Sequence, residues 1–149
     1  MQQIDGPTVA RLLDMPSLVE ALAAAFAEGA EVPPRHHHSI AHPEGPEATL
    51  LLMPAWQSGR SVGVKLVTIF PTNGARGLPA VMGIYLLSDG MTGEPQALID
   101  GPMLTLRRTA AASALGARFL AREDARHLVM VGTGALAPHL IEAHAAVRP

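Results

Sequence analysis

The stretch that most constrains what this chain can fold into is its last one, residues 126–149. Residues 127–131 form a short apolar run, which predicts a buried parallel strand. Residues 132–137 read G-T-G-A-L-A, a G-x-G-x-x-A turn, and the apolar residues after them follow a helical pattern. A strand, a glycine turn and a helix in this order are typical of the opening of a dinucleotide-binding βαβ unit.

The glycine turn has the residue types that this chemistry needs. Gly132 permits the tight turn, Gly134 lets the backbone approach a pyrophosphate, and Ala137 is small enough for the helix to pack on the strand. The pyrophosphate would lie at the helix N-terminus, where free N–H groups and the dipole favour an anion. The alternative is a plain strand-to-helix turn. The acidic residue that holds the ribose usually follows the glycines by about 20 residues, a position beyond Pro149, so we expect only the first part of a Rossmann domain.

The composition excludes several classes of protein. The chain has 149 residues, 48% of them hydrophobic, and a net charge of −2, which is unlike a nucleic-acid-binding surface or a disordered chain. The lack of cysteine excludes disulfides, thiolate metal sites and cysteine nucleophiles. No apolar run approaches the roughly 20 residues of a membrane span, and the N-terminus shows no signal-peptide pattern. We therefore expect a cytoplasmic protein that binds neither nucleic acid nor membrane.

Apolar periodicity, caps and turns predict a mixed, mostly antiparallel α/β unit in the first part of the chain. Helices are expected over residues 5–13, 16–28 and 103–121, and strands over residues 36–42, 48–55, 61–70, 80–88 and 96–100. A boundary is expected near residues 122–126, where the pattern changes to that of a parallel βα unit. Gly116, in the middle of the last helix, suggests close packing against another backbone.

Three basic residues lie at positions where a positive charge is unfavourable unless it has a partner. Lys65 lies inside the apolar run 62–67, where a lysine costs free energy unless it has a partner. It either faces water from an edge strand or points into a pocket. Arg107 and Arg108 lie near the N-terminus of the helix over residues 103–121, against the helix dipole. They either bind an anionic ligand or face solvent.

Residues 36–42 read HHHSIAH and contain four histidines. In a strand alternate residues share a face, so His36 and His38 could meet. They could bind a metal ion, or they could belong to a polar strand beside a pocket or to a pH-sensitive surface. Because no carboxylate stands at a telling spacing, we predict no metal site.

Several short motifs occur in order along the chain. They are Pro34-Arg35, Gly63-Val64-Lys65, Phe70-Pro71-x-Asn73, Arg76-Gly77-Leu78-Pro79, Asp89-x-x-Thr92-Gly93-Glu94-Pro95, Leu104-Thr105-x-x-Arg108-Thr109-Ala110-Ala111 and Gly132-Thr133-Gly134-Ala135. The ordered set resembles the ornithine cyclodeaminase/μ-crystallin family over essentially the whole chain, and it is far more specific than any single motif. The resemblance implies an α/β protein with a mixed α+β substrate-binding and dimerisation domain over residues 1–123. The start of a Rossmann NAD(P)-binding domain would follow over residues 124–149.

The family resemblance also implies roles for single residues. Arg35 and Lys65 match the pair that binds the substrate carboxylate, with Lys65 at the catalytic centre, and Arg108 matches an arginine between substrate and cofactor. The pyrophosphate turn matches Gly132, Thr133, Gly134, Ala135 and Leu136. Two residues depart from the family pattern. Ala80 stands where the cyclodeaminases carry a threonine, which weighs against a strict cyclodeaminase, and Leu136 stands where many members carry glutamine.

The activity that the resemblance implies is a reduction that uses NAD or NADP. The leading expectation is a reductase of cyclic ketimine acids such as Δ1-pyrroline-2-carboxylate, which would yield L-proline. The alternatives are ornithine cyclodeaminase, which converts L-ornithine into L-proline and ammonia, and an alanine-dehydrogenase-like activity. A non-catalytic binding or dimerisation module is a further alternative, as μ-crystallin shows for this fold. We expect a small cyclic imino acid or amino acid as substrate, a homodimeric parent protein, and no activity of residues 1–149 alone.

Overall fold

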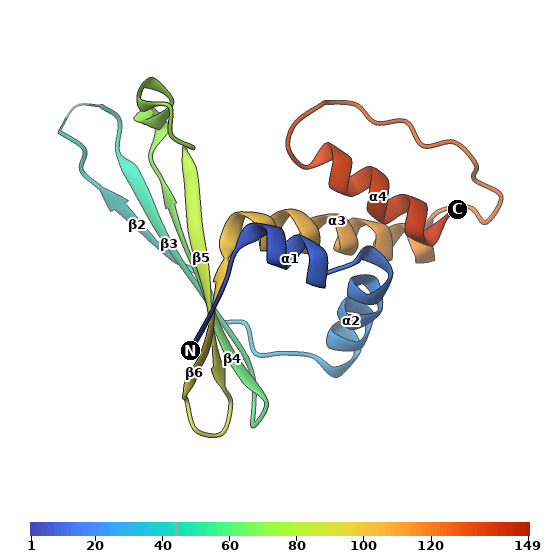
Figure 1. The fold of residues 1–149 in the computed structure, drawn as a ribbon, viewed down its shortest axis with the longest axis horizontal. Helices are drawn as coiled ribbons and strands as arrows, with labels where there is room; N and C mark the ends of the chain where they lie inside the picture. Colours follow the sequence, from blue (N-terminus) through green and yellow to red (C-terminus); the bar gives the residue numbers. More distant parts are fainter. Residues whose placement is uncertain (44) are drawn as a thin grey trace. The chain divides into compact units, whose positions relative to one another are not determined.

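The computed structural model of the chain describes residues 1–43 and 45–149. Figure 1 shows helices and strands that follow one another in a mixed α/β order. The elements are β1 (Gln2–Ile4), α1 (Gly6–Leu12), α2 (Met15–Glu28), β2 (His36–Ile40), β3 (Ala48–Gln57), β4 (Ser61–Ile69), the 3-10 helix η1 (Pro71–Arg76), β5 (Val81–Asp89), β6 (Pro95–Asp100), α3 (Gly101–Leu120) and α4 (Ala137–Val147).

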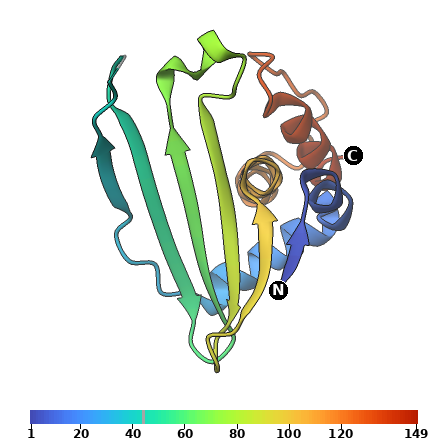
Figure 2. The same ribbon diagram turned by 60° about the vertical axis from the view of Figure 1, so that its left-hand side comes forward.

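The sheet has six strands in the order β1-β6-β5-β4-β3-β2, and Figure 2 shows β2 to β6 side by side. Neighbours from β2 to β6 run antiparallel, whereas β1 runs parallel to β6. The prediction of a mixed, mostly antiparallel arrangement is therefore confirmed. Strand β1 was not predicted, because its three residues are too few to show an alternating pattern.

The chain forms two compact units. One consists of residues 1–6 and 30–102 and holds the sheet, and the other consists of residues 7–29 and 103–149 and holds the bodies of the four α-helices. This division does not coincide with the boundary predicted near residues 122–126, which stays a prediction about functional domains. Within the part of the chain that the structure describes, no helix is long and apolar enough to cross a membrane.

The helical unit is built around small side chains. Its hydrophobic core cluster contains the buried residues Met15 and Val19 of α2, Ala110, Ala111, Ala114 and Leu115 of α3, and Ala143 of α4. Alanine lets helix backbones approach closely, and it is the residue with the highest helix propensity. The alanine-rich sequence of α3 therefore serves both the helix and its packing, and a core with few aromatic residues results.

Helix α2 begins one residue before the predicted start and ends at the predicted residue. Asp14 caps its N-terminus, where the side chain accepts a hydrogen bond from the Ser17 N–H at 3.0 Å. This bond holds the pKa of Asp14 below its ordinary value. Gly29 ends the helix with φ +79°, in the left-handed region that glycine adopts without strain.

Two loops of the sheet are held by side-chain hydrogen bonds. Asp89, at the end of β5, accepts bonds from the N–H groups of Thr92 and Met91 and from the Thr92 hydroxyl, at 2.8 to 3.0 Å. These bonds, first the one from the Thr92 N–H, hold the pKa of Asp89 below its ordinary value. The buried Asn73 donates from Nδ2 to the Pro79 carbonyl at 2.9 Å and closes the loop that contains η1. The motifs around Asp89 and Asn73 thus shape turns.

The strand predicted over residues 127–131 is not formed. The side chains of Leu128, Val129 and Val131 are 50%, 82% and 93% exposed. A strand exists through hydrogen bonds to a neighbouring strand, and among residues 1–43 and 45–149 no strand pairs with this run. The strand prediction is therefore wrong for this chain, whereas the helix predicted after the glycine turn is present as α4.

The expectation that Gly116 packs against another backbone is also wrong, because a Cβ atom at this position would meet nothing within 4 Å. We expect Gly116→Ala to raise the free energy of unfolding by roughly 0.5–1 kcal/mol, since alanine is favoured over glycine inside a helix. Gly29→Ala is the matched control. A Cβ atom there also meets nothing within 4 Å, but φ is +79°, so alanine should destabilise. Urea denaturation followed by circular dichroism measures both, and shifts of the same sign would contradict this account.

Candidate functional site

Lys65 lies in the middle of β4, an interior strand between β3 and β5. The residue is half-buried. The alternative of a lysine that faces water from an edge strand is therefore wrong, since the edge strands are β1 and β2. A half-buried ammonium in the interior of a sheet keeps its charge through an anion or through hydrogen-bonding groups around it.

The register of the sheet places Lys65 in a row of residues that crosses the strands. Lys65 lies opposite Met53 of β3 on one side and opposite Tyr85 of β5 on the other. Tyr85 in turn lies opposite Ile99 of β6. Directly opposed residues project from the same face of a sheet. One face of the sheet therefore carries a lysine between a methionine and a tyrosine.

Arg35 comes directly before β2 and is exposed. His36 lies opposite Leu52, so Arg35 lies beside the segment of β3 that contains Leu52 and Met53. Neighbouring strands are about 4.8 Å apart, so roughly 10 Å separates the backbones of Arg35 and Lys65. Two long side chains can converge across this distance on one anion above Met53. We refer to Arg35, Met53, Lys65 and Tyr85 as the cation row.

The histidines of β2 lie on an edge strand. The rings of His36 and His38 meet edge to face, with 6.2 Å between their centroids, as the alternation predicts. His36 lies opposite Leu52 and His38 opposite Leu50, and these leucines project from the face opposite Met53 and Lys65. Among residues 1–43 and 45–149, no group of three histidine, cysteine or acidic side chains lies together as a metal site would require.

Arg107 of α3 is buried, with 4% of its surface exposed. Nη1 and Nη2 donate to the carboxylate of Glu142 in α4 at 2.5 and 3.1 Å, and Nε and Nη2 donate to the Leu13 carbonyl at 2.9 and 2.5 Å. One guanidinium thus ties α3 to α4 and to the turn between α1 and α2. The sequence left Arg107 either facing solvent or binding an external anion, and both interpretations are wrong because its partner is a carboxylate of the chain itself.

Arg108, the next residue of α3, is exposed. Successive helix positions are about 100° apart around the axis, which separates Arg108 from the inward direction that Arg107 takes. Arg108 is therefore the arginine of this pair that a ligand can reach.

The glycine turn lies directly before α4. Gly132 has φ +103°, a conformation that glycine adopts readily and other residues avoid. Residues 132–135, which are Gly132, Thr133, Gly134 and Ala135, are exposed. Leu136 is half-buried and packs against the helical core. The Leu136 side chain is therefore part of the helical core, so the predicted contact of this residue with a cofactor is one that its backbone would make.

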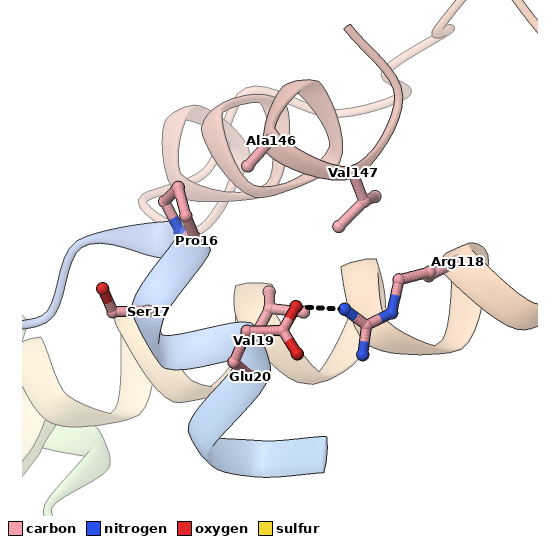
Figure 3. A pocket seen from close by; sticks show the side chains of 7 residues that line it. All are labelled: Pro16, Ser17, Val19, Glu20, Arg118, Ala146 and Val147. Carbon is pink, nitrogen blue, oxygen red and sulfur yellow. Dashed lines mark hydrogen bonds and ion pairs between the residues drawn. The ribbon is translucent and has the colours of Figure 1, made fainter. Parts of the chain in front are cut away.

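A cavity of about 410 Å³ lies among α2, α3 and the end of α4 (Figure 3). An ion pair between Glu20 and Arg118 is part of its wall. The lining residues are Pro16, Ser17, Val19, Glu20, Arg118, Ala146 and Val147. None of the residues predicted for the carboxylate or the cofactor is among them, so this cavity is separate from the predicted site.

Tyr85 is a member of the cation row that the sequence patterns did not single out. The signal that could have found it is Gly63, because a glycine inside an apolar strand marks the close approach of another group. The identity of that group depends on the register between β4 and β5, which a single sequence does not contain.

The sequence profile of the ornithine cyclodeaminase/mu-crystallin family matches residues 5–149. The Δ1-pyrroline-2-carboxylate reductase of Paracoccus denitrificans is 46% identical over 104 residues, which are 70% of this chain and 33% of that protein. The solved structure of the Thermococcus litoralis Δ1-pyrroline-2-carboxylate reductase with NADH and L-proline is similar with a TM-score of 0.84 and 32% identity, over 99% of this chain and 46% of that one. A lysine cyclodeaminase structure, which concerns recognition of L-lysine, L-ornithine and L-2,4-diaminobutyric acid, is similar with a TM-score of 0.80 and 31% identity, over 99% and 46%.

The chain spans less than half the length of each of these relatives. Their similarity confirms the predicted fold class, a mixed α/β fold that continues into the opening of a Rossmann unit. Within residues 1–43 and 45–149, that opening consists of the glycine turn and α4, and residues 127–131 before them form no strand.

We expect Arg107→Ala to lower the free energy of unfolding of the whole protein by about 1–3 kcal/mol, because it removes the bonds to Glu142 and leaves the Leu13 carbonyl without donors. Arg108→Ala is the matched control at the exposed neighbouring position, where a change below about 0.5 kcal/mol is expected. Chemical denaturation measures both variants. Similar losses in the two would show that Arg107 does not hold the helices together.

Proposed function

Because the chain belongs to the ornithine cyclodeaminase/mu-crystallin family, we propose that the whole protein reduces a small cyclic ketimine acid with NADH or NADPH. The proposed substrate is Δ1-pyrroline-2-carboxylate and the product is L-proline. The observation that supports the proposal is the cation row, in which Lys65 lies between Met53 and Tyr85 on one face of the sheet and Arg35 lies two strands away, at the start of β2. The similarity to a reductase whose structure contains NADH and L-proline supports the same substrate class.

Arg35 and Lys65 are proposed to bind the substrate carboxylate. Two charge-assisted bonds fix both its position and its orientation above Met53. The C=N carbon next to the carboxylate is then held at a constant place relative to the sheet, which is what a hydride transfer needs. Lys65, the half-buried member of the pair, is proposed to be the catalytic residue, which would contact the substrate carboxylate and thereby orient the C=N group.

The turn before α4 fits a nicotinamide dinucleotide, NAD or NADP. The positive φ of Gly132 and the exposure of residues 132–135 leave the backbone open beside a helix N-terminus, where a pyrophosphate is favoured. We assign the pyrophosphate contact to the backbone of Gly132, Thr133, Gly134, Ala135 and Leu136. When bound, the nicotinamide supplies the hydride, and the protein supplies position and electrostatics.

The chain is proposed to contain parts of two functional domains. Residues 1–123 are the substrate-binding and dimerisation domain, which the sheet with its cation row supports. Residues 124–149 are the start of the nucleotide-binding domain, which the glycine turn and α4 support. Arg108 is proposed to contact both substrate and cofactor, and its exposure on α3 is consistent with that role.

A cyclodeaminase that converts L-ornithine into L-proline and ammonia is the second candidate, because the chain is also similar to a lysine cyclodeaminase. The reductase is preferred because Ala80 stands where the cyclodeaminases carry a threonine. Two assays of the purified whole protein distinguish the reductase from the cyclodeaminase. Oxidation of NADH or NADPH that depends on Δ1-pyrroline-2-carboxylate supports the reductase, and release of ammonia from L-ornithine without that oxidation replaces it by the cyclodeaminase.

A homodimer through the other face of the sheet is part of the proposal. On that face Met82 and Ile84 of β5 are 37% and 42% exposed. Leu50 and Leu52 of β3 and Leu66 of β4 belong to the same face by register. An apolar sheet face needs cover, and a second copy related by a two-fold axis is the simplest cover.

The dimer predicts a light-scattering mass twice that of one chain of the whole protein. Ile84→Glu should yield a monomer, because a carboxylate would be buried in an apolar interface. Val81→Glu is the matched control, since Val81 lies on the same strand but projects from the face of the cation row. A two-fold contact in a crystal should bury more than about 1,000 Å². A wild-type monomer at micromolar concentration would refute the proposal.

Lys65→Ala in the whole protein should raise KM for the ketimine acid roughly tenfold or more, because a lost charge-assisted hydrogen bond costs about 1.5–3 kcal/mol. Arg60→Ala serves as the control, since Arg60 is an exposed cation in the turn between β3 and β4 and lies outside the cation row. Steady-state kinetics measure KM and kcat for each variant. If KM and kcat of Lys65→Ala equal those of the wild type, Lys65 does not bind the substrate.

A further inference from the structure

Tyr85 lies opposite Lys65, but its side chain leans along the sheet toward another residue. A Cβ atom built on Gly63 would be 1.8 Å from the Tyr85 hydroxyl oxygen and 2.5 Å from the carbon that carries it. The Tyr85 ring therefore crosses β4 directly above Gly63, two residues from Lys65 and on the same face. Glycine is the residue type that leaves room for it.

The environment of this ring is partly apolar. Tyr85 is half-buried, and burial raises the pKa of its phenol above the ordinary value of 10.0. The phenol is thus neutral at any pH below its ordinary pKa. The ring presents a flat, mostly apolar surface next to the Lys65 ammonium. A carboxylate held by Lys65 would have the rest of its molecule beside or above this surface.

We propose that Tyr85 is a specificity-determining residue, a wall that limits the ring size of the cyclic ketimine acid held by Arg35 and Lys65. The inference rests on the function proposed above and deepens it. Five-membered and six-membered ketimine acids carry the same carboxylate and the same C=N group, and they differ by one methylene. Arg35 and Lys65 would bind the carboxylate of either ring equally well. An apolar wall at a fixed distance from Lys65 would therefore discriminate between the two ring sizes.

The contact with Gly63 gives the proposal two opposite consequences. Truncation of Tyr85 removes the wall and makes room for a larger ring. A methyl group at position 63 occupies the place of the Tyr85 hydroxyl, so the tyrosine side chain has to move off Gly63, and the neighbouring space on this face is the one above Lys65. Tyr85→Ala should therefore widen the site and Gly63→Ala should narrow it.

The test uses the whole protein and measures kcat/KM for the five-membered ketimine acid Δ1-pyrroline-2-carboxylate and for its six-membered homologue. Tyr85→Ala should raise the ratio of the six-membered to the five-membered substrate by at least about fivefold, within the range that one methylene confers. Gly63→Ala should lower the same ratio. Tyr85→Leu also shortens the side chain but leaves a smaller cavity than Tyr85→Ala does. It replaces Tyr85→Ala in the test if the alanine variant does not fold.

Leu86→Ala is the matched control, because Leu86 follows Tyr85 on β5 and projects from the other face of the sheet. It should lower stability and leave the ratio of the two substrates unchanged. Parallel losses for both substrates in the Tyr85 and Gly63 variants would overturn the proposal and leave only a packing role. A wild-type protein that reduces neither ring would overturn the proposed function, and the ring-size inference with it, whereas wild-type activity with unshifted ratios would overturn the inference alone.

Discussion

The proposed carboxylate site depends on the register of the sheet. Side chains alternate between faces along a strand, so a slip of one residue in β4 would replace Lys65 by Val64 or Leu66 in the row. Two connections hold the register. The turn between β3 and β4 is closed by a bond from the Arg60 N–H to the Gln57 carbonyl at 3.0 Å. The longer connection between β4 and β5 is closed by Asn73, so a residue outside the cation row helps to hold Lys65 opposite Tyr85.

The sequence predicts those helices and strands that are determined by residues close together in the chain. The helices over 6–12, 15–28 and 101–120 follow from caps and periodicity, and the strands around Lys65 follow from apolar runs between turns. What it could not predict depends on distant partners. Residues 127–131 have a strand's composition, but in the part of the chain that the structure describes no strand lies beside them. The three residues of β1 are held by pairing with β6. For the same reason Lys65 was a candidate from sequence, while its neighbour Tyr85 was not.

The three cations that the sequence singled out have three different surroundings. Lys65 is half-buried in an interior strand, Arg108 is exposed on a helix, and Arg107 is buried and bound to a carboxylate. Adjacent arginines with the same charge and the same dipole environment thus differ in their surroundings, since one binds a carboxylate of the chain and the other is exposed. Composition and helix position do not distinguish them, because the partners of Arg107 lie 94 and 35 residues away along the chain.

The bonds of Arg107 bear on how relatives of this protein could exchange parts by recombination. A crossover near residues 122–126 would take α3 from one parent and α4 from the other, although the junction lies in an exposed connection that tolerates cutting. Such a chimaera keeps a buried guanidinium only if the second parent supplies a carboxylate at the position of Glu142. Helix α4 is thereby matched to α3 of its own chain. Exchange of α3, α4 and the turn before α2 as one group would keep these bonds, and this group extends across the domain boundary predicted near residues 122–126.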